Sequence, residues 1–360
     1  MFNHRKLIIP KKLQAGDTVA IISLSSGMLG NPELDGQRKL MEKRLQELDL
    51  QVIYTPHALH GETFIADHPQ ARAADLIWAF QNEQVNGIIA AIGGEDTYRI
   101  IPYLLANEEF RELVQKKPKV FIGYSDTTIN HLLFYKLGMR TYYGHSAIVD
   151  FGELGSQMLP YAREWFQRLF DGQSLYEIKS SPIWYLERDS FASSEIGKER
   201  TMKPEEHGFE CISGSGKVQG HLLGGCLESL GDLLRGRQAV INEEYKIFPS
   251  AASFQGAILF LETSEEKRSP QELELLLELI ETRGVFEVIG GVLIGKPQDE
   301  KYYEEYKQVC LRVIGKHGIP ILYNINFGHA HPKCILAYGA EIEVDYDEKR
   351  IQYCEPLVGM

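Results

Sequence analysis

Residues Lys119–Phe134 read KVFIGYSDTTINHLLF, an apolar run followed by a short polar corner and then by a pattern with helical spacing. The apolar run predicts a buried strand, and the pattern after the corner predicts a helix. Ser125 stands at this corner, where two interpretations are open. Ser, Asp and Thr all cap helices well, and a sharp strand-to-helix turn can instead lift a serine hydroxyl out of the sheet as a nucleophile. GYSDT matches the nucleophile motif G-x-S-x-G only in part, because Thr127 occupies the position of the second glycine.

Strand and helix patterns alternate along the chain before this corner. Apolar strand patterns lie at Asp17–Ser26 and Val85–Gly94, and an amphipathic helical pattern lies between them at Arg38–Leu48. Near-continuous apolar strands separated by helices indicate a parallel sheet covered on both faces. Functional sites of such sheets gather at the carboxyl ends of the strands. Both GGED (93–96) and GYSD (123–126) lie at such ends.

The sequence changes character between about residues 180 and 215, where it is polar, rich in Ser, Glu, Gly and Pro, and without a clear period. Loops this long are usually functional or disordered. A second set of α/β patterns follows, with a strong strand at Phe254–Thr263 and a helix that Ser269 and Glu272 begin as a capping box. The last residues alternate apolar and polar around Asp347, as a hairpin does.

We therefore predict an α/β protein with two domains. Residues 1–178 are predicted to form a mostly parallel sheet flanked by helices, as in Rossmann and flavodoxin-like folds. Residues 179–215 are predicted to be a connection with an active-site loop. Residues 216–360 are predicted to form a C-terminal α/β domain with a mixed sheet.

Composition argues against several classes of protein. The 360 residues carry a net charge of −12, which argues against nucleic acid and anionic membranes as main partners. No apolar run is long enough for a membrane span or a signal-peptide core, and this favours a cytoplasmic protein. The five cysteines are scattered and no Cys/His cluster has zinc spacing. We therefore expect neither a metal nor an organic cofactor.

A serine nucleophile needs a base, and the base needs a third group that holds its tautomer and stabilises the imidazolium. His329 follows Gly328 at the end of an apolar strand, and Glu262 terminates the apolar run GAILFLE. Each of these residues also has an ordinary structural interpretation, as a hydrogen-bonded or surface side chain. His331 is a competing candidate for the base.

The segment AAIGGEDTYR has a rival interpretation. It resembles the GGDGT phosphate-binding motif of NAD kinases and diacylglycerol kinases, but it lacks the glycine that should follow Asp96. A glycine pair after a strand can equally supply a backbone N–H to an oxyanion.

Six segments occur together in one order along nearly the whole chain: GDTVAIISLSS, AIGGEDTYRIIPYL, VFIGYSDTT, GHLLGGCLESL, GAILFLETSEE and NINFGH. In combination they resemble the LD-carboxypeptidase family of serine peptidases, including its microcin C immunity branch. The resemblance implies two α/β domains, a serine peptidase or amidohydrolase activity through an acyl-enzyme, and a homodimer. It implies that Ser125 is the nucleophile, Glu262 the orienting acid and His329 the base.

The resemblance also implies an oxyanion hole made of backbone N–H groups near Gly94 and Glu95 and at Asp126. Arg99 and Arg268 are candidates for binding a substrate carboxylate, although surface salt bridges are the alternative for both.

Some segments depart from the muropeptide-cleaving members of the family. Leu24 stands where a proline is common, and GGED replaces a GGYGS-like form. The long loop at Ser180–Ser215 is similar to that of the immunity branch, where it helps to cover an adenylate-like group. The aromatic residues available for stacking on a base, or for simple packing of the loop, are Trp184, Phe191 and Phe209.

Two substrate classes follow from the resemblance. One is the L,D-peptide bond of muropeptides in cell-wall recycling. The other is a microcin C-like peptidyl- or aminoacyl-adenylate, whose hydrolysis gives self-immunity or detoxification. The partner is thus a small peptide, a muropeptide or an aminoacyl-nucleotide. The alternative from another class is a catalytically silent protein on the same fold that binds nucleotides or peptides.

Overall fold

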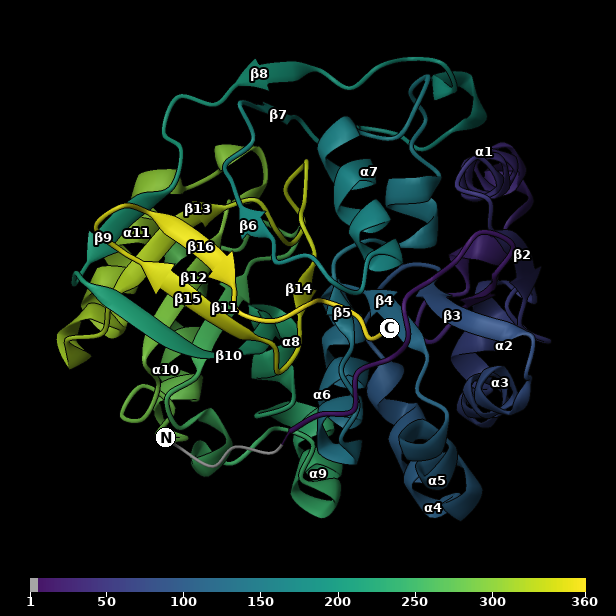
Figure 1. The fold of residues 1–360 in the computed structure, drawn as a ribbon, viewed down its shortest axis with the longest axis horizontal. Helices are drawn as coiled ribbons and strands as arrows, with labels where there is room; N and C mark the ends of the chain where they lie inside the picture. Colours follow the sequence, from purple (N-terminus) through teal and green to yellow (C-terminus); the bar gives the residue numbers. More distant parts are fainter. Residues whose placement is uncertain (1–5) are drawn as a thin grey trace. The chain divides into compact units, whose positions relative to one another are not determined.

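The computed structural model describes residues 6–360, which divide into two compact units. The N-terminal unit consists of Leu7–Gln173, Arg188–Arg200 and Val358–Met360. The C-terminal unit consists mainly of Ser174–Glu187 and Thr201–Leu357. Each unit combines a sheet with helices (Figure 1), which confirms the predicted fold class.

The N-terminal unit contains a parallel sheet whose strands pair in the order β5-β4-β3-β1-β2. Strand β1 is buried along its whole length, and β3 along all but one residue, as their apolar sequences predict. The bounds of the strands are β1 Thr18–Ile22, β2 Gln51–Tyr54, β3 Val85–Ala90, β4 Val120–Gly123 and β5 Tyr142–Tyr143.

Helices connect the parallel strands of this unit, because a parallel pair needs a crossover. Asn107 caps helix α5 by accepting a hydrogen bond from the backbone N–H of Phe110. The bounds of the helices are α1 Asp35–Gln46, α2 Gly61–Asp67, α3 Pro69–Gln81, α4 Ile101–Ala106, α5 Glu108–Lys116, α6 Thr128–Leu137 and α7 Pro160–Gln167.

The C-terminal unit is built on a mixed sheet of eight strands in the order β6-β16-β15-β10-β11-β12-β13-β9. Strand β10 (Lys217–Cys226) pairs antiparallel with β15 (Glu341–Asp345) in its first half and parallel with β11 (Ile258–Glu262) in its second half. Strands β12 (Gly291–Gly295) and β13 (Ile321–Ile325) continue the parallel part. Strands β11, β12 and β13 are fully buried. Because they run parallel, their carboxyl ends lie at the same edge of the sheet.

The antiparallel margins of this sheet include the predicted hairpin. Strands β15 and β16 (Arg350–Tyr353) pair antiparallel around Asp347, and β6 (Glu177–Ile178) pairs with β16. Strand β14 (Leu336–Ala337) is not part of this eight-stranded sheet. The helices of the unit are α8 Leu227–Asp232, α9 Gly236–Tyr245, α10 Pro270–Glu281 and α11 Tyr303–Val313.

The segment 179–215 contains more regular structure than its sequence predicts. Strands β7 (Ile183–Tyr185) and β8 (Met202–Pro204) pair antiparallel, and β9 (Glu210–Ser213) pairs with β13. These strands were not predicted from the sequence. The partners of these strands lie far away in the sequence or across an intervening loop. The local sequence pattern therefore does not indicate the strands.

No helix among residues 6–360 is long and apolar enough to cross a membrane.

The predicted capping box at the start of α10 is confirmed, and it yields a stability test. Ser269 accepts a hydrogen bond from the backbone N–H of Glu272, and the Glu272 carboxylate accepts one from the backbone N–H of Ser269. We expect Ser269→Ala to lower the free energy of unfolding by about 1 kcal/mol. The backbone N–H of Glu272 loses its acceptor, and the reciprocal hydrogen bond from the backbone N–H of Ser269 to Glu272 is weakened. Urea denaturation followed by circular dichroism measures this change. Ser269→Thr keeps a capping hydroxyl, so equal losses in both variants would contradict the explanation.

Candidate active site

Ser125 occupies a strained turn at the carboxyl end of β4. Tyr124 is extended, Ser125 has φ +63°, and a short 3-10 turn (Ser125–Thr127) leads into α6. A positive φ is costly for a residue with a Cβ and persists where the surroundings enforce it. Neither this turn nor α6, both fully described, begins with a side-chain capping hydrogen bond. The geometry therefore favours the nucleophile-elbow interpretation over the helix-cap interpretation.

Asp126, the residue after Ser125, holds together the loops that follow three neighbouring strands. Its buried carboxylate accepts hydrogen bonds from the Ser25 hydroxyl (2.7 Å) and from the backbone N–H of Thr97 (2.9 Å). The Ser25 hydroxyl in turn accepts from the backbone N–H of Asp96 (3.1 Å). Asp96 is ion-paired with Arg72 at 2.6 Å, and the Arg72 side chain is fully buried. The ends of β1, β3 and β4 are thus fixed by one polar network.

Burial dominates the electrostatics of Asp126. It raises the pKa of Asp126 to about 6, although the hydrogen bonds from Ser25 and Thr97 act in the opposite direction. This carboxyl is compensated by neutral donors and sits close to the charge of Asp96.

Gly93, in the loop after β3, approaches Ser125 closely. A Cβ at this position would lie 2.8 Å from the Ser125 Cβ, 2.9 Å from its Oγ and 3.4 Å from the backbone nitrogen of Asp126. Only a residue without a side chain fits there. Gly94 and Glu95 were predicted as oxyanion-hole residues, whereas Gly93 was not. The sequence signal that could have identified Gly93 is the glycine pair itself, because paired glycines often mark a place where two backbone segments come close.

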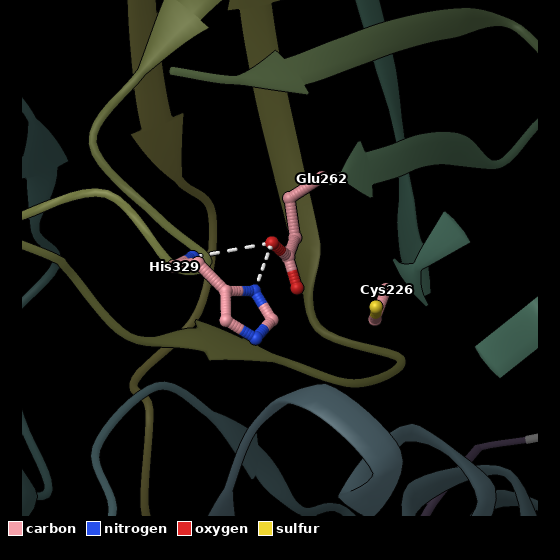
Figure 2. Close-up of side chains that lie close together, drawn as sticks. All are labelled: Cys226, Glu262 and His329. Atoms are coloured by element: carbon pink, nitrogen blue, oxygen red, sulfur yellow. Dashed lines mark hydrogen bonds and ion pairs between the residues drawn. The ribbon is translucent and has the colours of Figure 1, made fainter. Parts of the chain in front are cut away.

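Glu262 and His329 form a hydrogen-bonded pair in the C-terminal unit (Figure 2). One carboxylate oxygen of Glu262 accepts from His329 Nδ1 (2.7 Å) and from the backbone N–H of His329 (3.1 Å). Glu262 ends β11, and His329 lies in the loop after β13. Gly328 has φ +91°, and a Cβ there would lie 2.5 Å from a Glu262 carboxylate oxygen. The motif Gly-His is therefore required by the closeness of this pair.

The surroundings of His329 favour the imidazolium. Burial alone would lower the pKa of His329, but the charge and hydrogen bond of Glu262, together with those of Glu265, raise it to about 10. Glu265 Oε2 lies 2.9 Å from His329 Nε2. The hydrogen bond with His329 lowers the pKa of Glu265 to about 2. Both ring nitrogens therefore face a carboxylate.

Cys226 ends β10 directly beside Glu262, with which it is in register. Its thiol donates to Glu228 (3.3 Å), and burial raises the pKa of this thiol well above its usual range. Cys226, Glu262 and His329 each offer a donor atom within 4.8 Å of the others. Because Glu262 and His329 Nδ1 are engaged with each other and the thiol is held protonated, we do not assign these residues as metal ligands.

Two family models match the chain. The LD-carboxypeptidase N-terminal domain matches residues 19–144, and the LD-carboxypeptidase C-terminal domain matches residues 219–344. These matches span more than half of the 360 residues. The chain belongs to the LD-carboxypeptidase family. The resemblance that its motifs indicated is confirmed, and with it the expectation of an enzyme of the hydrolase class.

Relatives of this LD-carboxypeptidase family member fall in both functional branches. An MccF-like protein from Streptococcus pneumoniae, solved in complex with AMP, is 41% identical with a TM-score of 0.90, and the match covers 94% of this chain and 99% of that one. The microcin C7 self-immunity protein MccF of Escherichia coli is 26% identical over 79% of this chain and 78% of its own. The probable murein peptide carboxypeptidase of Bacillus subtilis is 26% identical over 94% of this chain and 92% of its own.

Other residues that the sequence singled out in this LD-carboxypeptidase have structural partners. His331 Nε2 lies 3.2 Å from a carboxylate oxygen of Glu187. Arg99 is paired with Asp96 at 3.0 Å. Arg268 is paired with two neighbouring acids, Glu266 at 2.5 Å and Glu272 at 3.3 Å.

The three candidate stacking residues differ in burial. Trp184 and Phe209 of the C-terminal unit are both buried, and Lys296 lies over the Trp184 ring at 4.9 Å from its centroid. Phe191, in the part of the loop that belongs to the N-terminal unit, is partly exposed. A packing role therefore explains the presence of Trp184 and Phe209 better than it explains that of Phe191.

The raised pKa of Asp126 predicts a pH-dependent contribution to stability. The folded protein binds this proton more tightly than the unfolded chain, whose value is near 3.8. The stabilisation that the protonated Asp126 side chain contributes is therefore fully present below about pH 4 and is lost as the pH rises through about 6. Asp126→Asn keeps an acceptor and removes the titration. We expect the unfolding free energy of the variant, minus that of the wild type, to rise between pH 4 and pH 7 by up to about 3 kcal/mol.

Chemical denaturation at several pH values measures this difference. A difference that does not change with pH would show that Asp126 stays ionised throughout, and would contradict the stated effect of burial.

Proposed function

We propose that this protein hydrolyses aminoacyl- or peptidyl-adenylates of the microcin C kind through an acyl-enzyme. The observation that carries the proposal is the likeness, over 94% of the chain and at 41% identity, to an MccF-like protein solved with AMP. A nucleotide-binding site in a hydrolase family directs attention to substrates in which an acyl group is joined to a nucleotide. The proposed role is self-immunity or detoxification in the cytoplasm, by a homodimer.

In this proposal Ser125 is the nucleophile, His329 the base and Glu262 the acid that orients it. Ser125 belongs to the N-terminal unit and the other two residues to the C-terminal unit. Two observations support the roles: the positive φ of Ser125 at the end of a parallel strand, and the hydrogen bond of Glu262 to His329 Nδ1. The second fixes the tautomer and leaves Nε2 as the nitrogen that accepts the serine proton.

The proposed reaction has two halves. His329 Nε2 takes the Ser125 proton as Oγ attacks the acyl carbonyl, and it then gives that proton to the departing nucleotide portion. Water repeats the sequence and releases the acid. Backbone N–H groups of Gly94, Glu95 and Asp126 are proposed as the donors to the oxyanion, because the turn that begins at Gly93 packs directly against Ser125.

We propose that aromatic side chains stack on the nucleotide base of the substrate and that a cationic side chain binds the carboxylate of the substrate. Phe191 is the most exposed of the three aromatic candidates, and Trp184 and Phe209 would act from buried positions. Arg99 is the proposed cation, since it keeps 38% of its side chain exposed while paired with Asp96.

A second candidate function is cleavage of the L,D-peptide bond of muropeptides. The 26% identity to the probable murein peptide carboxypeptidase of Bacillus subtilis, over 94% of this chain, favours it. The same nucleophile and base would serve both reactions. A catalytically silent binding protein on the same fold is the remaining alternative.

A paired assay of wild type and Ser125→Ala tests these functions. Each protein is incubated with aspartyl sulfamoyl adenosine and, separately, with a muramyl tetrapeptide that ends in D-Ala, and products are measured by mass spectrometry. We expect the wild type to release aspartate from the adenylate analogue and the variant to lose at least about a thousandfold in rate. Release of D-Ala alone would establish the second function. Absence of both products and of any acyl adduct would favour the silent binder.

The close approach of Gly93 to Ser125 predicts a second rate effect. Gly93→Ala forces the glycine turn away from the nucleophile, because its new Cβ would lie 2.9 Å from the Ser125 Oγ. We expect the hydrolysis rate to fall on the order of a hundredfold or more, as on loss of an oxyanion donor. Gly315→Ala is the matched control, since its Cβ would meet nothing nearer than 3.6 Å. Equal rates in the two variants would contradict the placement of the oxyanion donors.

A further inference from the structure

His329 is held between two carboxylates of different character. Glu262, at Nδ1, is 1% exposed and sits at the end of a buried strand. Glu265, at Nε2, lies three residues later in the segment that leads to α10, and its side chain is 63% exposed. The first carboxylate is fixed at the end of a buried strand. The second is mostly exposed and is held by hydrogen bonds with His329 and with its own backbone N–H.

The Glu265 contact opposes the chemistry that His329 is proposed to perform. A carboxylate at 2.9 Å from Nε2 favours a proton on that nitrogen. A ring with protons on both nitrogens has no lone pair with which to accept the Ser125 proton. In this conformation Nε2 cannot accept a proton, so the proposed role of His329 as the base requires Glu265 to leave Nε2.

The charged groups around His329 in the C-terminal unit are mostly acidic. Glu262 and Glu265 contact the ring directly, Glu228 from α8 interacts with its charge, and the Cys226 thiol from β10 lies beside Glu262. Glu187 acts on Glu265 and pairs with His331.

The nearest cations in the sequence are engaged elsewhere. Lys267 pairs with Asp299, and Arg268 pairs with Glu266 and Glu272. The described surroundings of Nε2 therefore favour a positively charged group on the substrate.

We propose that Glu265 is a specificity-determining cap on His329: it leaves Nε2 to bind an ammonium group next to the scissile carbonyl, so that substrates with a free α-amine are selected over N-acylated ones. This inference rests on the proposed hydrolysis of aminoacyl-nucleotides. A neutral substrate would move the Glu265 carboxylate away from His329 and leave it without a cationic partner. An ammonium group on the substrate instead pairs with Glu265 in place of the His329 imidazolium. His329 then releases its Nε2 proton to solvent and becomes the base for Ser125.

The cap can be tested without any turnover. Histidine labelled with ¹³C at Cε1 is titrated by NMR in the full-length protein, and the His329 resonance is assigned by its loss in His329→Gln. We expect Glu265→Gln to lower the pKa of His329 by about one unit or more, as on removal of a neighbouring opposite charge. Glu266→Gln, which removes the adjacent acid that pairs with Arg268, should leave it unchanged. An unchanged pKa in Glu265→Gln overturns the proposal.

The selectivity is tested with aspartyl sulfamoyl adenosine and its Nα-acetyl derivative. We expect wild type and Glu266→Gln to prefer the free amine by about tenfold in kcat/KM, the size of one charge-assisted contact. Glu265→Gln should lose this preference, with a higher KM for the free amine and faster turnover of the acetylated compound than in wild type. A preference retained in Glu265→Gln overturns the proposal.

Failure of the proposed function is distinguishable from failure of the cap. If wild type hydrolyses neither compound, calorimetric binding of both replaces the rates. A free-amine preference that Glu265→Gln abolishes then supports the cap, and one that it retains overturns it.

Discussion

A carboxylate buried at the end of a strand needs compensation, and the contact between Glu262 and His329 supplies it. An ionised group that is 1% exposed would be expensive without partners. The backbone N–H and the ring Nδ1 of His329 both donate to it. The same contact fixes the tautomer of His329 and requires glycine at position 328, because any Cβ there would meet the carboxylate. The path of the chain after β13 thus follows from one charge at the end of β11.

The N-terminal unit meets a similar demand with different groups. Asp126 is buried at the elbow and receives two neutral donors, so burial prevails and its pKa rises. Asp96, one loop away, is compensated by the cation of Arg72 instead. A hydroxyl, that of Ser25, joins the two carboxylates by donating to one and accepting from the backbone next to the other. The polar network joins the three strand ends next to the strained turn of Ser125.

Local sequence signals predicted much of this structure. The buried parallel strands, the elbow at Ser125, the strand-end positions of Glu262 and His329 and the capping box of α10 all have apolar runs, glycines or caps nearby in the sequence. Strand β9 was missed because its partner β13 begins only at Ile321, and β7 and β8 were missed because a long loop separates these two partners. The Arg72–Asp96 pair and the approach of Gly93 to Ser125 were missed for the same reason. Glu265 was missed because an exposed acid in a loop looks ordinary until the ring it faces is known.

The two carboxylates on His329 pose a conflict that only one of them can resolve. A general base works best when its pKa lies near the operating pH, whereas His329 is raised to about 10 by Glu262 and Glu265 together. Glu262 is bound into the sheet and also holds the tautomer that catalysis needs. Glu265 is exposed and contributes nothing to the orientation of the ring through Nδ1. Removing Glu265 alone lowers the basicity of His329 while its position is kept. The two acids therefore meet two separate requirements of the imidazole. Glu262 orients the ring at all times, and the departure of Glu265 frees Nε2 only in the substrate complex.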